Sequence, residues 1–313
     1  MKTLSFVIPC YRSEQTISSV VDEIRKKMKE LEQYDHEIIL VNDCSPDGTM
    51  EVLKKLALED ERITAIDFAR NFGQHSALMA GLRQTKGDVV ICLDDDGQTP
   101  PAQADRLIKA LEEGADVAYA RYDHKKHSQF RNFGSRMNER MLRFMLDKPK
   151  ELYVSSYFAA KRYIVDDMIR YENCYPYVIG LVLRSTKNIV NVDIDHQDRI
   201  SGASGYNLRK LLDLWFNGFT AFSVKPLRVA TIIGLLSTLA GIIYAIVIII
   251  QHFILPDRVQ GFASLVAILI FFGGMMLLTL GLVGEYVGRI YISLNNSPQY
   301  VIKEIVRKEK ADP

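Results

Sequence analysis

The sequence has little cysteine and almost no net charge. Its four cysteines, Cys10, Cys44, Cys92 and Cys174, lack the close spacing that zinc sites and disulfide frameworks use. We therefore expect reduced thiols, as in a cytosolic environment. Lysine and arginine together number 39 and aspartate and glutamate 38, which leaves a net charge of +1. This balance argues against a general nucleic-acid-binding surface, and we expect no nucleic-acid partner.

Several common signals are also missing. No G-x-G-x-x-G follows the first apolar segment, which disfavours a dinucleotide fold of that type, and no G-x-x-x-x-G-K-[ST] indicates a P-loop. The first apolar run stops at Pro9, so it is too short for a signal peptide and is better interpreted as a strand. Long uncharged runs are absent from residues 1–225 but fill residues 229–284. The composition therefore predicts a soluble part followed by a membrane part.

Strand and helix patterns alternate along the soluble part. The expected strands cover residues 4–8, 37–41, 63–68, 88–93 and 115–120, and the expected helices cover residues 14–31, 49–58, 75–84 and 103–112. This alternation predicts an α/β fold with a mostly parallel sheet and helices on both faces. Ligands bind beyond the carboxyl ends of strands in such sheets. Polar, Gly or Pro residues follow four of these strands, so we expect one crevice formed by residues 9–11, 42–45, 70–73 and 94–98.

The most informative of these segments is DDDGQ at residues 94–98. Three adjacent carboxylates repel one another unless a positive group lies among them. Their hard oxygens suit Mg²⁺ or Mn²⁺, and Mg²⁺ is usually held by one or two carboxylates and substrate phosphates. Asp94 and Asp96 share one face of an extended chain, and Gln98 continues that face. The simpler alternative is an acidic turn at a strand end.

Two other segments suit a nucleotide. Tyr11 can cover a base or ribose, and Asp43 can accept a hydrogen bond from a base N–H, which would discriminate between bases. The segment from Asp43 onwards also has the composition of a turn with a helix cap. Both interpretations hold together if Asp47 caps the helix that begins at Thr49 while Asp43 faces the pocket.

Four segments carry a family resemblance: SFVIPCY at 5–11, VNDCSPDGT at 41–49, RNFGQ at 70–74 and DDDGQ at 94–98. They resemble the motifs of family 2 glycosyltransferases with a GT-A fold. More narrowly they are similar to polyprenyl-phosphate glycosyltransferases, which include dolichol-phosphate mannose synthase and bacterial undecaprenyl-phosphate enzymes. The resemblance implies that a nucleotide sugar binds at Pro9, Tyr11 and Asp43. It also implies that Asp94, Asp96 and Gln98 bind the metal and the diphosphate.

We extend the predicted nucleotide-sugar site to Asp94 and to the neighbouring Glu14, Arg70 and Asp95. The family's usual Tyr-Asn-Glu is replaced by Tyr-Arg-Ser-Glu at residues 11–14. Glu14 therefore either substitutes for the family's Glu or only starts the following helix. The predicted catalytic residues are Asp94, Asp96 and Arg199, and the predicted metal ligands are Asp96 and Gln98.

One segment departs from the family. Relatives usually carry an Asp followed by Phe-Arg in the region of residues 151–162, and that Asp is often given a catalytic role. The equivalent position here is Leu152 or Ser156, neither of which is acidic, and Glu151 is a weak substitute. A phosphate acceptor does not need a base, because its second pKa is about 6 and it is largely ionised at neutral pH. Alignment and neutralisation of the leaving diphosphate remain necessary.

The segment RISGASGY at 199–206 resembles the family's Arg-x-x-Gly-x-Ser-Lys-Tyr loop. Backbone N–H groups of a Gly/Ser loop can approach a phosphate, and an arginine can bind it in a bidentate fork. An ordinary Gly-Ser turn is the alternative. The predicted acceptor-phosphate site comprises Arg199, Ser201, Gly202, Ser204 and Arg209, the last supplying the charge that Gly205 lacks. The basic residues between 121 and 143 are either a solvated helix face or a surface near anionic lipid or acceptor phosphate.

The remaining residues predict a membrane anchor. Residues 206–222 have the pattern of an amphipathic interfacial helix, although packing on the soluble core is an alternative. Residues 229–250 and 262–284 are each long enough to span a bilayer. The basic flanks place both termini in the cytoplasm. Glycines in the second span suit close helix contacts, and the oligomers known among relatives imply a homo-oligomer. GEYVGRIY at 284–291 resembles the end of the second span in the bacterial enzymes.

The expected organisation has four parts: a GT-A domain at 1–205, a juxtamembrane helix at 206–228, a hairpin at 229–288 and a cytoplasmic tail at 289–313. The expected function is metal-dependent, inverting transfer of a sugar, most simply from a UDP-sugar, to polyprenyl phosphate at the bacterial inner membrane. Two alternatives remain. One is a transferase that extends a polysaccharide, and the other is a non-catalytic protein that binds nucleotide sugars or acts as a scaffold.

Overall fold

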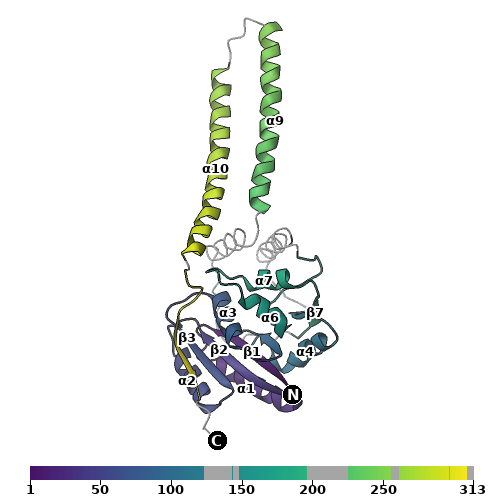
Figure 1. The fold of residues 1–313 in the computed structure, drawn as a ribbon, viewed down its shortest axis with the longest axis vertical. Coiled ribbons are helices and arrows are strands. Elements are labelled where there is room, and N and C mark those ends of the chain that lie inside the picture. The colour runs from purple at the N-terminus through teal and green to yellow at the C-terminus, as the bar shows by residue number, and fades with distance from the viewer. Residues whose placement is uncertain (123–142, 144–147, 196–224, 255–260, 296, 309–313) are drawn as a thin grey trace. The chain divides into compact units, whose positions relative to one another are not determined.

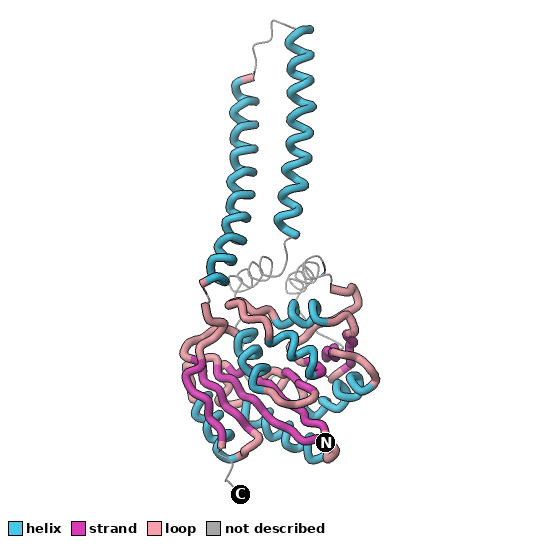
Figure 2. The backbone as a smooth tube through the Cα atoms, in the orientation of Figure 1, coloured by secondary structure: helices cyan, strands magenta, loops and turns pink. Residues whose placement is uncertain are grey.

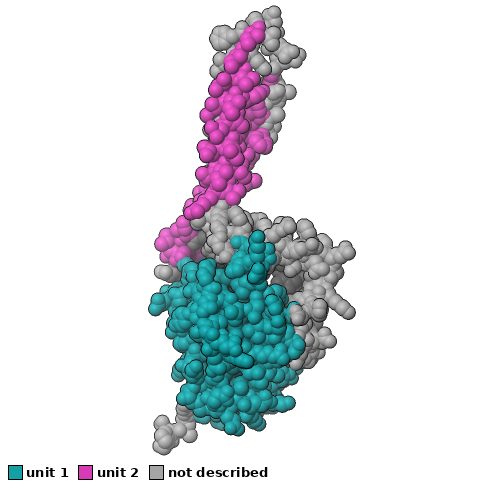
Figure 3. All heavy atoms as spheres, turned by 90° about the vertical axis from the view of Figure 1, so that its right-hand side faces the viewer, with its two compact units in different colours: residues 1–211, 296–313 teal, residues 212–295 magenta. Residues whose placement is uncertain are grey.

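The computed structural model describes residues 1–122, 143, 148–195, 225–254, 261–295 and 297–308 (Figure 1). The chain divides into two compact units. Unit 1 contains residues 1–211 and 296–313, and unit 2 contains residues 212–295 (Figure 3). Unit 1 is therefore built from two stretches of sequence that the whole of unit 2 separates.

Unit 1 is organised around one sheet, which has eight strands among the described residues, in the order β7-β5-β6-β4-β1-β2-β3-β8. Strand β1 is parallel to β2 and β4, β2 is parallel to β3, and β5 is parallel to β7. Strand β6 is antiparallel to β4 and β5, and β8 is antiparallel to β3. The predicted α/β fold with a mostly parallel sheet is confirmed. The strands are β1 (Lys2–Cys10), β2 (Tyr34–Asn42), β3 (Ile63–Phe68), β4 (Val89–Cys92), β5 (Val117–Arg121), β6 (Phe158–Lys161), β7 (Ile189–Asp193) and β8 (Ile302–Arg307).

Helices cover both faces of this sheet (Figure 2). Alternate residues of a strand point to opposite faces, so Leu4, Phe6 and Ile8 pack against one helical layer. Val7 faces the other layer, where Gly81 of α3 approaches so closely that an added Cβ would lie 2.4 Å from a Val7 methyl carbon. The first layer contains α1 (Ile17–Glu30), α2 (Thr49–Glu59) and α4 (Ala104–Glu112), and the second contains α3 (Gln74–Gln84), α6 (Arg162–Ile169) and α7 (Val178–Ser185).

The element boundaries differ from the sequence predictions in physically simple ways. Helix α1 begins at Ile17 instead of residue 14, because the Ser13 carbonyl accepts bonds from the N–H groups of Thr16 and Ile17 and forms a turn first. A short 3₁₀ helix, η1 (Pro101–Gln103), precedes α4. Strand β3 has the predicted limits of residues 63–68.

The largest difference concerns the residues after unit 2. The prediction treated residues 289–313 as a tail, whereas Ile302–Arg307 forms strand β8 at the edge of the sheet. The strand is fastened by ion pairs and hydrogen bonds as well as by its ladder with β3. Glu304 lies 2.6 Å from the Lys54 ammonium of α2, and the Arg307 guanidinium donates to Gln84 at 2.6 Å.

Unit 2 consists, in its described part, of α9 (Lys225–Ile254) and α10 (Phe262–Leu294), which run side by side in opposite directions (Figure 1). The Ser237 hydroxyl lies 3.7 Å from the Met275 sulfur. Large apolar side chains are exposed along both helices, as Leu236 at 60% and Leu277 at 71% illustrate. By length and composition both helices are able to cross a membrane, over Leu227–Tyr244 and Phe271–Leu294. Helix α9 begins four residues before the predicted boundary at 229, and α10 continues ten residues beyond the predicted end at 284.

Candidate active site

The carboxyl ends of β1, β2, β3 and β4 meet at one edge of the parallel sheet, as the sequence predicted. Hydrogen bonds join the four loops that follow these strands into one assembly. The Arg12 N–H donates to the Ser45 hydroxyl at 3.1 Å, which links the first two loops. Asp43, Asp95 and Asp94 make three further links.

Asp43 links the loop after β2 to the loop after β3. Its carboxylate accepts the Phe72 N–H at 2.7 Å and the Gly73 N–H at 2.9 Å. Gly73 has a φ of +88°, a left-handed conformation that favours glycine. Burial raises the pKa of Asp43, while the two N–H bonds act in the opposite direction. Because each carboxylate oxygen has two acceptor sites, Asp43 retains the capacity to accept a ligand N–H as well.

Asp95 links the loop after β4 to the loop after β1. One of its oxygens accepts the Tyr11 N–H at 3.0 Å and also the Ser13 hydroxyl. Burial raises the pKa of Asp95, and the bonds from Ser13 and Tyr11 oppose that shift. Tyr11 is 46% exposed as a residue, although its backbone is fixed by its N–H bond to Asp95. The predicted nucleotide-site residue Asp95 therefore holds the backbone that presents the Tyr11 ring.

Asp94 links the loop after β4 to the start of α3. Its Oδ1 accepts the Gln74 amide N–H at 2.9 Å, and its Oδ2 accepts the Ser156 hydroxyl. Burial raises the pKa of Asp94 to about 6, helped by the charges of Asp96 and Asp95 and opposed by the Ser156 and Gln74 bonds. The carboxylate is thus held on both sides by neutral donors.

Asp96 and Gln98 form the turn at the end of the acidic segment. The Gln98 N–H donates to Asp96 Oδ1 at 3.0 Å, and Gly97 between them has a φ of +76°. The donor set of carboxylate and amide oxygens suits a hard divalent cation. The mutual repulsion that contributes to the raised pKa values of Asp94 and Asp95 is also what such a cation would relieve. No group of three or more His, Cys, Asp or Glu side chains suited to a metal occurs within the described residues, so phosphate oxygens of a ligand would have to complete the coordination.

The other predicted nucleotide-site residues occupy separate places around these loops. Pro9 is buried in β1, paired with Val41. Glu14 is exposed and accepts the Gly48 N–H at 3.1 Å, so it fastens the turn before α2 and does not begin a helix. Asp47 accepts the Thr49 hydroxyl at 2.6 Å at the same turn. Arg70 is exposed, with its guanidinium carbon 4.6 Å from the Phe72 ring centroid.

The segment that departs from the family, residues 151–162, places no acidic side chain in the site. Leu152 is buried in the core, and Glu151 is exposed. Ser156 contacts Asp94 directly, across 62 positions of sequence. Of the basic residues between 121 and 143, Arg121 pairs with Asp193 at 2.6 Å and Arg143 donates to the Lys150 carbonyl at 3.0 Å. The predicted acceptor-site residues Arg199, Ser201, Gly202, Ser204 and Arg209, the basic residues within 123–142 and the amphipathic segment 206–222 lie outside the described residues.

The sequence analysis did not assign Gln74 or Ser13 to this site, and it named Ser156 only as a possible equivalent of the family's Asp. Each is a neutral polar residue with no chemistry of its own that would single it out. Gln74 ends the RNFGQ segment, and its place directly after the four loop residues 70–73 was the available signal. The signal for Ser156 was its alignment with the family's Asp, but its contact with Asp94 arises only in the folded chain, where β6 lies beside β4.

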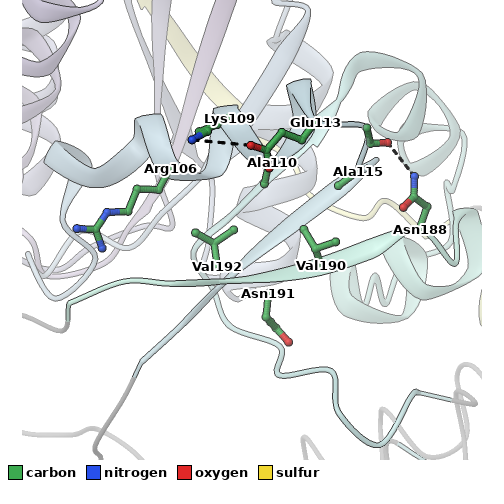
Figure 4. Close-up of a pocket in the computed structure, with 10 residues that line it drawn as sticks. Arg106, Lys109, Ala110, Glu113, Ala115, Asn188, Val190, Asn191 and Val192 are labelled. Atoms are coloured by element: carbon green, nitrogen blue, oxygen red, sulfur yellow. Dashed lines mark hydrogen bonds and ion pairs between the residues drawn. The ribbon is translucent and has the colours of Figure 1, made fainter.

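A cavity of about 780 Å³ lies between α4 and β7, at the opposite edge of the sheet from β8 (Figure 4). Val190 and Val192 point toward α4, and Lys109 pairs with Glu113 at 3.8 Å along its rim. None of its lining residues belongs to the four strand-end loops. The cavity is therefore separate from the acidic site.

The family model of Glycosyl transferase family 2 matches residues 5–169, which include all four strand-end loops. The chain belongs to glycosyl transferase family 2. A second model, the GtrB C-terminal hairpin, matches residues 225–290 of this family 2 glycosyltransferase, the segment that forms α9 and most of α10. The predicted resemblance to polyprenyl-phosphate glycosyltransferases is confirmed by the relatives described next.

Undecaprenyl-phosphate 4-deoxy-4-formamido-L-arabinose transferase of Proteus mirabilis (strain HI4320) is 34% identical to this family 2 glycosyltransferase over 98% of this chain and 95% of the relative. Uncharacterized glycosyltransferase YkcC of Bacillus subtilis (strain 168) is 32% identical over 96% of this chain and 93% of the relative. Among solved structures, glucosyl-3-phosphoglycerate synthase from Mycobacterium tuberculosis with Mn²⁺ and UDP-glucose matches with a TM-score of 0.52 and 19% identity, over 74% of this chain and 78% of the other. This last likeness confirms the fold.

Proposed function

We propose that this glycosyltransferase transfers a sugar from a nucleotide sugar, specifically a UDP-sugar, to undecaprenyl phosphate or a similar polyprenyl phosphate. The observation that carries the proposal is the match to an undecaprenyl-phosphate sugar transferase along 98% of the chain, hairpin included. The strand-end site supports the same conclusion, because it combines an acidic segment with a loop that presents an exposed tyrosine ring.

The donor would bind at the strand-end loops. Asp43 would accept a base N–H, and the exposed Tyr11 ring would cover the base or ribose. Asp96 and Gln98 would hold a Mg²⁺ or Mn²⁺ ion, which supplies stabilisation of negative charge on the diphosphate. The occurrence of Mn²⁺ and UDP-glucose together in a protein of the same fold supports this pairing of donor and metal.

The reaction is a single displacement with inversion. An anionic oxygen of the acceptor phosphate forms a bond to the anomeric carbon, and the bond from that carbon to the diphosphate oxygen breaks, releasing UDP. No proton has to leave the acceptor, since a phosphate monoester is largely ionised at neutral pH. The neutral Ser156 beside Asp94 is compatible with such an acceptor, whereas a sugar hydroxyl would need a base. Arg199 and the loop at 201–204 would bind the acceptor phosphate, with Arg209 adding charge.

The two apolar helices suit a substrate that stays in the bilayer. Helix α9 has 30 residues and so a length of about 45 Å, which exceeds the hydrocarbon thickness of about 30 Å. We propose that both helices span the bacterial inner membrane with unit 1 and both termini in the cytoplasm. The homo-oligomer and the role of residues 206–222 at the interface stay predictions.

The test is to incubate the purified full chain with undecaprenyl phosphate, Mn²⁺ or Mg²⁺, and a panel of UDP-, GDP- and dTDP-sugars that includes the UDP form of 4-deoxy-4-formamido-L-arabinose. Lipid products are read by mass spectrometry. The result expected is a sugar-phosphate-lipid from one UDP-sugar that Asp96→Ala abolishes. Asp22→Ala is the matched control, because Asp22 is 71% exposed and lies on α1, so it should leave the product unchanged.

Other outcomes would favour the alternatives. Release of nucleotide without a glycolipid would indicate a different acceptor, such as a growing polysaccharide. Nucleotide binding with no turnover across the whole panel would favour a non-catalytic binding protein.

A further inference from the structure

The residues after α10 and at the start of β8 are firmly attached to the rest of unit 1. We call residues 299–303 the C-terminal strap. Gln299 is 4% exposed, and its amide donates to the carbonyls of Asn173 at 2.9 Å and Tyr171 at 3.4 Å. The Val301 carbonyl accepts the Ala69 N–H at 2.9 Å, at the point where β3 leads into the third strand-end loop. The strap therefore lies beside the base of a loop that belongs to the candidate active site.

A chain of aromatic contacts runs from the strap to Asp43. The Tyr300 ring stacks on Phe68 with centroids 5.3 Å apart and an interplanar angle of 7°. Phe68 in turn meets the edge of Phe72, with centroids 5.7 Å apart. The Phe72 N–H is one of the two donors to the Asp43 carboxylate. The Tyr300 hydroxyl also accepts an Arg83 guanidinium N–H at 3.0 Å.

A second chain of contacts is polar and runs from the strap to the loop after β2, on either side of Asp43 in the sequence. The Lys303 ammonium lies 3.3 Å from Oδ2 of Asp67, a carboxylate whose side chain is 8% exposed. Oδ1 of Asp67 accepts the Asn42 amide N–H at 2.7 Å. Asn42 Oδ1 then accepts the Ser45 N–H at 3.1 Å, which shapes the loop after β2. Lys303 thus balances the buried charge that orients Asn42.

We propose that Tyr300 and Lys303 are positioning residues for the nucleotide-sugar site, acting through Phe72 and Asn42 on the two loops that Asp43 joins. This inference rests on the proposed function, because it assigns the strap to the same donor site. Each residue fixes one neighbour of Asp43, so the strap determines how well the loops are ordered before the donor binds. Ordered loops bind a ligand more tightly because less conformational entropy is lost on binding.

The test compares four variants of the full chain. Tyr300→Leu removes the ring, Tyr300→Phe keeps the stack but loses the Arg83 bond, and Lys303→Met keeps the length of the side chain but loses its charge. Glu304→Gln is the matched control. Glu304 lies on β8 next to Lys303, but its ion pair with Lys54 leads to α2 and to no strand-end loop.

Two measurements separate positioning from a merely structural role. Hydrogen–deuterium exchange followed by mass spectrometry reports on peptides covering residues 42–49 and 70–74, with α1 as the internal reference. Equilibrium binding of UDP with Mn²⁺, and KM and kcat for whichever nucleotide sugar the wild type uses, report on the site. Tyr300→Leu and Lys303→Met should raise the UDP dissociation constant and KM about three- to tenfold while kcat stays within about twofold, a range that the loss of one aromatic or ionic contact accounts for.

The expected exchange pattern is equally specific. Tyr300→Leu should speed exchange at residues 70–74 and Lys303→Met at residues 42–49, while α1 keeps its wild-type rate. Tyr300→Phe, unlike Tyr300→Leu, should show wild-type hydrogen exchange and wild-type UDP binding. Glu304→Gln should match the wild type in both measurements. Faster exchange in all peptides together, or variants that exchange and bind UDP as Glu304→Gln does, would overturn the proposal. A wild type that binds no nucleotide at all would instead contradict the proposed function, while the exchange data would still decide whether the strap orders the loops.

Discussion

Replacing Asp43 by asparagine tests whether this carboxylate joins the second and third strand-end loops. In the wild type the N–H groups of Phe72 and Gly73 donate to the Asp43 carboxylate at 2.7 and 2.9 Å. Asparagine keeps one acceptor oxygen, but its NH₂ group faces one of these two N–H groups. One charge-assisted bond is lost and one partly buried donor is left without its acceptor, at a cost of about 1.5–3 kcal/mol. A neutral amide is easier to bury than a carboxylate whose pKa burial already raises, so part of this cost is offset.

We therefore expect Asp43→Asn to lower the free energy of unfolding of unit 1 by about 2 kcal/mol. For a unit formed by residues 1–211 and 296–313, this corresponds to a fall in melting temperature of about 4–8 °C. The melting temperature is measured by circular dichroism on the full chain in detergent. Hydrogen exchange of residues 70–74 should also accelerate, because the two N–H groups lose their common acceptor.

Asp22→Asn is the matched control. It removes the same charge from a side chain that is 71% exposed and pairs only along its own helix with Arg25, and it should change stability by about 0.5 kcal/mol or less. If Asp43→Asn melts at the wild-type temperature and residues 70–74 exchange at the wild-type rate, the carboxylate does not hold the loop. The interpretation of Asp43 as the link between the two loops would then be wrong.

Four further outcomes are expected. Removal of divalent cations by EDTA should abolish glycolipid formation, and added Mn²⁺ or Mg²⁺ should restore it; a rate that chelation leaves unchanged would rule out the metal. Ser156→Ala removes one donor to Asp94 and should lower kcat/KM about tenfold, equivalent to about 1.4 kcal/mol, whereas Ser156→Thr keeps the hydroxyl and most of the activity. Deletion of residues 297–313 removes five paired positions of the β3–β8 ladder and should cost at least about 2–3 kcal/mol in unfolding experiments, at roughly 0.5 kcal/mol per pair. Burial, with a smaller effect of nearby Arg62, lowers the pKa of His36 from 6.5. The unfolded state therefore binds more protons than the folded state below that pH, so stability should fall from pH 7 toward pH 5. His36→Gln should lose that part of the pH dependence.

The sequence was most informative where local chemistry and chain periodicity agree. The alternating strands and helices predicted the sheet, and DDDGQ at 94–98 predicted an acidic site at a strand end because neighbouring carboxylates need compensation. The joining of the four loops also followed from strand order, since parallel strands end at the same edge. The structure brings Asp43 and Asp95 into the predicted group of strand-end loops, but their bonds to backbone N–H groups were not foreseen.

Other features depend on contacts that no local pattern reveals. Ser156 reaches Asp94 only because β6 inserts antiparallel beside β4. Strand β8 has the sequence IKEIVR, whose mixed charged and apolar residues fit an exposed edge and give a weak strand signal. Its partner β3 lies more than 230 positions earlier, as the bond between Ala69 and Val301 shows. The helix starts were misplaced by a few residues where a loop residue such as Ser13 forms a turn first.

The position of β8 also determines the order in which the sheet can be completed during synthesis. Strand β3 is made early, but its partner follows residues 212–295 in the sequence. At a translation rate of about 5–20 residues per second, the ribosome needs roughly 10–50 seconds to produce residues 69–301, which separate the two strands. Throughout this interval one edge of β3 has unpaired N–H and C=O groups, which is the kind of surface on which other chains add strands. The edge of β3 therefore stays open to strand addition by other chains until the last strand emerges.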